Sequence, residues 1–236
     1  MQLFSYSRSR ISLRFFFLFL LISVCISQSL YAEDDWKLIK NDDGIEVYTR
    51  PRKNSNIDEC KGIVTIPASM NIVCRILANI PLHKKYIHQG YDSFFIKQWE
   101  KGHCVHYLAF KTPWPCWNRD LVYDTQAEVN PEQERSVVYS RAVKELLVPY
   151  RKNHVRVTNS EHIWILEKIS LDKTRVTYKN FSDHGGSVPQ FLINIMIVDE
   201  PYYSLKNLRD FVIESIKDSS YKTMVCPEVP IKAERK

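Results

Sequence analysis

The chain has 236 residues, of which 44% are hydrophobic and 25% are charged, a composition that suits one globular domain with a substantial core. It carries 33 Lys and Arg against 27 Asp and Glu, a formal net charge of +6. These charges are interspersed along the chain, which argues against a nucleic-acid groove. No linker, repeat or low-complexity tract divides the sequence.

Residues 1–32 differ from the rest. Arg8, Arg10 and Arg14 precede an apolar run from Phe15 to Ile26, and Ala32 ends a small-residue cleavage site. This order is typical of a signal peptide, and the run is shorter than the roughly 20 apolar residues of a membrane span. We expect cleavage and export to the periplasm or the medium. The alternative is an uncleaved inner-membrane anchor with the domain facing the periplasm.

Five cysteines follow this segment, namely Cys60, Cys74, Cys104, Cys116 and Cys226. In an oxidising compartment an odd number leaves at least one thiol without a partner in the same chain. Cys104 and Cys116 stand at different distances from the turn between them, so a bond directly across that hairpin is not expected. No C-x-x-C, G-x-S-x-G, phosphate-loop or dinucleotide motif occurs. We therefore expect no metal, no cofactor and no catalytic residue.

After residue 33 the pattern predicts a short helix over residues 34–41 and strands over 44–50 and 57–66, with a turn at Asp42-Asp43-Gly44. Ser69 can cap a helix that Pro81 ends. Further strands are predicted over residues 91–99, 104–111, 119–129, 135–143, 154–157, 162–169 and 175–181. Short polar links join several of them, so the sheet should be mainly antiparallel.

The run from His106 to Tyr123, HYLAFKTPWPCWNRDLVY, predicts a hairpin. Both faces of its first strand are largely apolar, so the strand is either covered on both sides or covered on one side while it lines an apolar cavity on the other. Pro113 and Pro115 should stop the pairing between residues 112 and 118. In the second strand Arg119 and Asp120 point opposite ways, so they do not form a ready-made salt bridge.

A helix that is apolar nearly all round begins at Gln190 and extends to Val198. Such a helix is buried on more than one side. Pro201 is expected to kink or restart it, and an amphipathic stripe continues to Ile216. One model is a long helix that closes a cavity under a curved sheet. From the residues alone, a helix that merely fills a solid core is the slightly simpler explanation.

The order of these segments resembles a START (StAR-related lipid-transfer) domain. The hairpin motif W-P-x-x-N-R-D and the helix start G-G-x-V-P-x-x-x-x-N, in this order, carry most of the resemblance, which covers residues 36–216. It implies an α+β helix-grip fold, in which a curved, mainly antiparallel sheet wraps around a long C-terminal helix and encloses an apolar cavity. The expected organisation is a signal peptide at 1–32, a START-like domain at 33–222 and a C-terminal tail at 223–236.

This resemblance implies that the chain binds, and transfers or shields, a single lipid or other hydrophobic molecule, and that it is not an enzyme. The chain departs from the family in its extra Cys116 and in its predicted export signal, which most eukaryotic relatives lack, and these departures suggest a bacterial exported member. Transient contact with a membrane surface, a monomeric state and no nucleic-acid partner are expected. The alternative is a cyclase or hydrolase that acts on a bulky apolar substrate in the same cavity, for which polar His, Asp and Tyr side chains should converge inside. A third possibility is an interaction module with a filled core.

Strand alternation combined with this fold gives the candidate ligand-binding residues. They are His106, Leu108, Phe110, Leu121, Tyr123, Tyr139, Arg141, Tyr178, Asn180, Phe191, Asn194, Ile195 and Val198. Taken singly, an aromatic residue at such a position is more often ordinary core than a ligand contact. Arg141 inside would need a partner or a ligand head group, and an exposed strand face is its alternative. Arg119 is expected to brace the hairpin turn, and Asp183-His184 to make a turn before the helix.

Overall fold

The computed structural model describes residues 35–218, so the predicted signal peptide (1–32) and C-terminal tail (223–236) lie outside the described residues. Packing divides the chain into two units, residues 1–35 and 36–236, and every element named here belongs to the second. Of the helices between residues 35 and 218, none combines the length and the apolar character that crossing a membrane requires.

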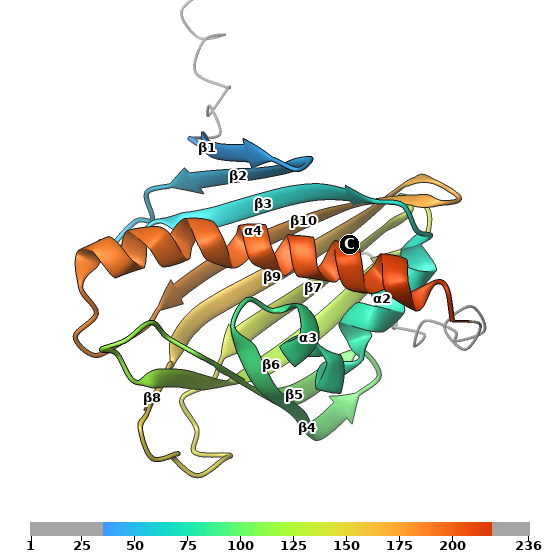
Figure 1. The fold of residues 1–236 in the computed structure, drawn as a ribbon. Helices are drawn as coiled ribbons and strands as arrows, with labels where there is room; N and C mark the ends of the chain where they lie inside the picture. Colours follow the sequence, from blue (N-terminus) through green and yellow to red (C-terminus); the bar gives the residue numbers. More distant parts are fainter. Residues whose placement is uncertain (1–34, 219–236) are drawn as a thin grey trace, which may run out of the picture. The chain divides into compact units, whose positions relative to one another are not determined.

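Ten strands and one long helix dominate the described part of the chain (Figure 1). The strands are β1 (Lys37–Asp42), β2 (Ile45–Arg50), β3 (Glu59–Ile66), β4 (Gly90–Glu100), β5 (His103–Phe110), β6 (Asn118–Asn130), β7 (Arg135–Ala142), β8 (His154–Arg156), β9 (Asn159–Ser170) and β10 (Lys173–Asp183). The helices are α2 (Met70–Ala78), the 3₁₀ turn η1 (Ile80–Leu82), α3 (His83–Tyr86) and α4 (Gln190–Ser215).

The strands form one sheet in the order β1-β2-β3-β10-β9-β7-β6-β5-β4. Every pair along this path is antiparallel, and β8 adds to the start of β6 in parallel. Helix α4 crosses one face of the sheet and packs on β2, β3 and α3 (Figure 1). The α+β helix-grip architecture implied by the resemblance is therefore confirmed.

The predicted helix over residues 34–41 is wrong, because residues 37–41 belong to strand β1 (Lys37–Asp42). Its residues pair with β2 across a tight turn in which Asp43 and Gly44 both have positive φ, at 52° and 70°. That combination matches the twist of a hairpin. Leu38 and Ile39 stay exposed, so no helical stripe is buried and strand pairing determines the conformation. The helix α3, and the 3₁₀ turn before it, were not predicted.

Helix α4 runs continuously through Pro201, so of the two predicted outcomes, a kink or a restart, the restart does not occur. It lies very close to β3 at Gly62. A Cβ atom at that glycine would stand 2.5 Å from Leu205 Cδ1 and 3.3 Å from Pro201 Cβ. The missing side chain on β3 thus lets the helix approach the sheet. The α4 side chains of Leu205, Leu208 and Val212 are fully buried.

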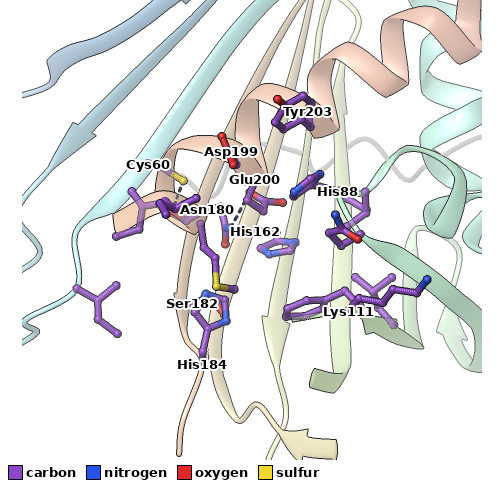
Figure 2. A pocket seen from close by; sticks show the side chains of 18 of the residues that line it. Cys60, His88, Lys111, His162, Asn180, Ser182, His184, Asp199, Glu200 and Tyr203 are labelled. Carbon is purple, nitrogen blue, oxygen red and sulfur yellow. Dashed lines mark hydrogen bonds between the residues drawn. The ribbon is translucent and has the colours of Figure 1, made fainter. Parts of the chain in front are cut away.

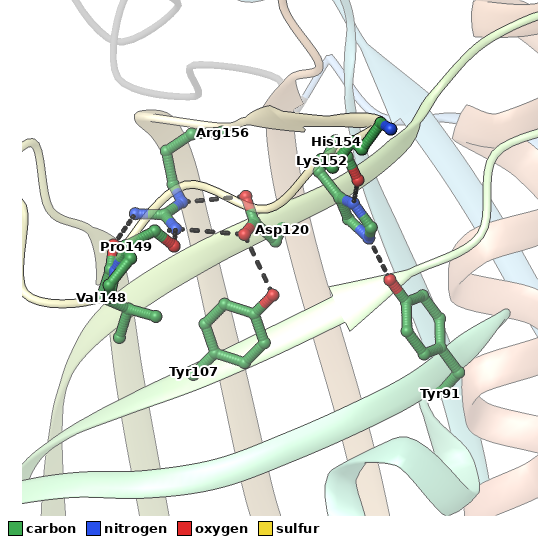
Figure 3. A network of polar contacts seen from close by, with 8 residues as sticks. All are labelled: Tyr91, Tyr107, Asp120, Val148, Pro149, Lys152, His154 and Arg156. Atoms are coloured by element: carbon green, nitrogen blue, oxygen red, sulfur yellow. Dashed lines mark hydrogen bonds and ion pairs between the residues drawn. The ribbon is translucent and has the colours of Figure 1, made fainter.

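The outer face of the central hairpin is also covered. Val105, Tyr107, Ala109 and Val122 form a second, smaller core under residues 143–148. Arg156 anchors this covering segment, because its guanidinium binds both carboxylate oxygens of Asp120 at 2.9 and 3.1 Å and donates to the carbonyl of Val148 (Figure 3). Of the two arrangements predicted for this strand, the structure has the second: one face of β5 is covered, and the opposite face lines the cavities of the candidate site.

Candidate functional site

Two adjoining cavities lie between the sheet and the helices. The first, called here the α4 cavity, has a volume of about 390 Å³ and is bounded by the first half of α4, β5, β10 and the residues just before β3. The second, the α2 cavity, has a volume of about 210 Å³ and is bounded by α2, α3, β7 and β9. The wall between the two cavities consists of four residues that line both of them: Ile87, Leu108, Tyr123 and His162.

Tyr123 and His162 form the polar part of this separating wall. The Tyr123 hydroxyl lies 2.7 Å from His162 Nε2 and 2.9 Å from Ser160 Oγ. Burial lowers the pKa of His162 to about 3, and it raises the pKa of Tyr123 well above the usual value. Both side chains are therefore uncharged at neutral pH. They offer hydrogen bonds to a guest molecule but no charge.

Glu200 on α4 places a carboxyl group inside the α4 cavity, near the His162 ring (Figure 2). Its Oε1 accepts hydrogen bonds from Tyr178 at 2.8 Å and Ser204 at 3.2 Å, and its Oε2 accepts one from Asn180 Nδ2 at 2.9 Å. Burial raises the pKa of Glu200 to about 7, although the three hydrogen bonds oppose that shift. The group is thus neutral in part of the population at neutral pH.

The α2 cavity contains two more histidines, the buried His106 and the half-buried His83, whose rings meet edge to face with centroids 5.1 Å apart. His83 Nε2 lies 2.9 Å from the carbonyl of Leu77, and His106 Nδ1 lies 3.3 Å from Thr125 Oγ1. Burial lowers the pKa of His83 to about 4 and that of His106 well below its ordinary value. Both histidines are accordingly neutral.

The entrance loop before α4 is held by Arg119. This buried arginine donates to the carbonyls of Trp117, His184 and Gly185, which tie the hairpin turn to the start of α4. Asp183 Oδ1 accepts from the Gly185 N–H at 3.1 Å. Arg119 therefore braces the hairpin turn, as predicted, and Asp183 makes the predicted turn.

Six of the thirteen candidate residues line the cavities: His106, Leu108, Phe110, Tyr123, Asn180 and Ile195. Leu121, Tyr178 and Val198 instead pack in the core beside them. Phe191 and Asn194 face outward on the first turns of α4.

Tyr139 and Arg141 lie on the opposite face of the sheet, outside both cavities. Arg141 binds Glu161 there at 3.3 Å. Strand alternation correctly predicted that Tyr139 and Arg141 share one face of β7. It could not decide which face is the inner one, and in β7 the inner positions belong to Ser136, Val138 and Ser140.

Sequence reasoning missed Glu200, His162 and His83. Glu200 stands four residues after Met196 and four before Ser204, a spacing that places all three on one side of a helix. A carboxylate in an otherwise apolar helical face was the available signal. His162 had a comparable one, because it alternates with Trp164 and Leu166 on β9. Between residues 35 and 218 no group of three or more His, Cys, Asp or Glu is arranged to hold a metal ion.

Comparison with known proteins bears on this architecture. No family model matches the chain. A StAR-related lipid transfer protein from Xanthomonas axonopodis, known from a crystal structure, is 31% identical in sequence to this chain and superposes with a TM-score of 0.69. The match covers 76% of this chain and 99% of the Xanthomonas chain. The chain belongs to the StAR-related lipid transfer (START) family.

Two further relatives of this START protein are more distant. Rat phosphatidylcholine transfer protein is 26% identical over 166 residues, which cover 68% of this chain and 75% of the relative. Human StAR-related lipid transfer protein 5 is 16% identical, with a TM-score of 0.72 over 85% of this chain and 97% of its own. The latter likeness supports the fold alone.

Proposed function

We propose that this START protein holds one lipid molecule in the α4 and α2 cavities and carries it between membranes. The single observation behind the proposal is the pair of adjoining cavities under α4, in a chain 31% identical to a StAR-related lipid transfer protein. Enclosure of an acyl chain or a ring system would contribute about 0.8 kcal/mol per buried CH₂. Partial filling of both cavities is then enough for tight binding.

Exposed apolar side chains near the α4 cavity support a membrane step. In the turn between β5 and β6, Trp114 is 90% exposed and Trp117 is 60% exposed, and their neighbour Pro113 lines the cavity. On α4, Phe191 is 63% and Ile195 is 50% exposed. Tryptophan favours the interface between water and lipid. We propose that this rim touches the membrane while the lipid enters or leaves.

The proposed location is outside the cytoplasm, after cleavage behind Ala32. Besides the order of residues 1–32, one observation supports it. Cys74 is disulfide-bonded, whereas Cys60, Cys104 and Cys116 are free thiols. Disulfides persist in oxidising compartments. Cell fractionation, with determination of the N-terminus of the recovered protein, tests the location, and an intact Met1 on a cytoplasmic protein would refute it.

The alternative function, a cyclase or hydrolase, needs an acid or base tuned near the working pH. The cavity histidines do not meet this need, because pKa values of about 3 for His162 and about 4 for His83 make them weak bases. Glu200, with a pKa of about 7, is better tuned, but three hydrogen bonds already engage its carboxylate. Lipid holding is therefore the better-supported function.

The decisive experiment is mass spectrometry of lipids that co-purify with the protein, followed by transfer between donor and acceptor vesicles. We expect one lipid per chain and transfer that saturates with protein concentration. A matched variant, Leu108→Trp, fills the wall shared by both cavities and should reduce lipid content. Leu171→Trp, at a position 83% exposed, is the control and should leave it unchanged. No bound lipid and no transfer across several lipid classes would refute the proposal.

A further inference from the structure

The interior of the α4 cavity holds an acidic side chain but no positively charged one among the described residues. Among the described residues that line the two cavities, Lys111 is the one lysine or arginine, and its side chain is exposed. Burial keeps the pKa values of His162 and His184 at about 3 and about 4, so these rings are neutral at pH 7. The deep polar group that can carry charge is the Glu200 carboxyl, which is acidic.

A lipid phosphate placed in this part of the cavity would be poorly stabilised. Buried phosphates need cations or several hydrogen-bond donors. The donors of Tyr178, Asn180 and Ser204 near Glu200 are already committed to its carboxylate. An anionic head group would also face, in a poorly solvated space, the negative charge that Glu200 carries in part of the population at neutral pH.

A hydroxyl group fits the same place well. Glu200 can accept a further hydrogen bond, since a carboxylate has about four acceptor sites and donors occupy three of them. Asn180 Oδ1 is buried in the same cluster and accepts no hydrogen bond of normal geometry among the described residues, although the neighbouring His162 ring interacts with the Asn180 side chain. Its orientation follows from the bond that Nδ2 donates to Glu200. Glu200 thus has room for one more donor and Asn180 Oδ1 lies in the same cluster, and the hydroxyl of an alcohol supplies one hydrogen to this pair of acceptors.

We propose that Glu200 and Asn180 receive the hydroxyl end of an uncharged lipid alcohol, and that this contact makes the protein select such lipids over phospholipids. The proposal rests on the proposed lipid-holding function and specifies its ligand class. The hydroxyl hydrogen donates to the carboxylate, and the apolar body of the lipid fills the remaining cavity space toward Leu108 and Ile195.

Three lipids with the same acyl chains test this selection by competition for the purified protein: dioleoylglycerol, its methyl ether, and dioleoylphosphatidylcholine. The methyl ether keeps the oxygen but loses the donated hydrogen. We expect dioleoylglycerol to bind more tightly than either competitor, by about tenfold or more, because a hydrogen bond to a charged acceptor is lost in each.

Two variants locate the effect. Glu200→Gln keeps the shape and one acceptor but removes the charge, and it should reduce the preference for the alcohol over its ether to about threefold. Glu214→Gln makes the same change at an exposed position of the same helix and should leave the preference unchanged. If Glu200→Gln does not fold, the preference of the unaltered protein still decides the question.

The outcomes separate the two proposals. Equal binding of the alcohol and its ether, or tighter binding of the phospholipid, would overturn the alcohol proposal and leave lipid holding intact. A preference that Glu200→Gln does not alter would overturn the role of Glu200. Failure of all three lipids to bind would count against lipid holding itself, and the alcohol proposal would fall with it.

Discussion

Replacement of Glu200 by glutamine should stabilise the protein more at alkaline than at acidic pH. Burial raises the pKa of Glu200 from 4.5 to about 7 in the folded protein. Between these two values the folded state binds a proton that the unfolded state has lost, so wild-type stability decreases as the pH rises through this window. Above pH 7 both states are deprotonated, and the loss is complete.

The size of the effect follows from the same two pKa values. One pKa unit corresponds to about 1.4 kcal/mol, so the difference between pH 5 and pH 8 amounts to about 2 to 3 kcal/mol. Glutamine does not titrate and removes this penalty. The gain in unfolding free energy of Glu200→Gln over wild type should therefore be about 2 to 3 kcal/mol larger at pH 8 than at pH 5.

Chemical denaturation of the two proteins at pH 5 and pH 8 measures this quantity directly. The pH-dependent part of the Glu200 hydrogen bonds is already contained in its pKa of about 7, and the part that does not depend on pH cancels from the comparison. The neutral histidines, such as His83 and His162, lower stability below about pH 6.5 in both proteins, so they cancel as well. The same gain at both pH values would refute the placement of a poorly solvated carboxyl group in the α4 cavity.

Three other predictions concern packing, the outer network and the rim. Gly62→Ala places a methyl group 2.5 Å from Leu205 Cδ1 and should cost about 1 to 3 kcal/mol of unfolding free energy in urea; unchanged stability would contradict the close approach of α4 to β3. Asp120→Ala leaves the buried Arg156 guanidinium unpaired and should cost about 3 to 5 kcal/mol, seen as a lower melting temperature in calorimetry, and a loss below 1 kcal/mol would show that the pair is solvated. Trp114→Ser, at a side chain 90% exposed, should change stability by less than about 0.5 kcal/mol yet slow transfer and weaken vesicle binding in flotation assays; unaltered transfer would exclude this rim from the membrane contact.

Most of the fold could be predicted because local signals and tertiary packing agree. The strands from β2 to β10 follow alternating patterns, and the prolines at 113 and 115 end the pairing between Phe110 and Arg119 where expected. Among the strands, the exception is β1. Its residues lack a buried side, so no periodic pattern reports its conformation, and pairing with β2 across Asp43-Gly44 determines it.

The cavities were harder to predict than the strands. Alternation shows which residues share a face, but both faces of β5 are covered, one by α4 and its neighbours and the other by residues 143–148. The same difficulty misplaced Tyr139 and Arg141, since a polar inner face of Ser136 and Ser140 resembles an exposed one in sequence. Inner and outer faces of a cavity-forming sheet can both mix polar and apolar residues.

Glu200 illustrates why the binding chemistry in particular was missed. Helix α4 has little amphipathic contrast in its first half, because apolar residues surround it and a cavity, rather than a close-packed core, lies along one side. A carboxylate on such a helix looks like a solubilising charge next to Pro201. Its role emerges only when Tyr178, Asn180 and Ser204, from β10 and the next helical turn, are seen to donate to it. Sequence periodicity locates the helix, whereas the polar end of the cavity is assembled from residues up to 26 positions apart, between Tyr178 and Ser204, which only the folded sheet brings together.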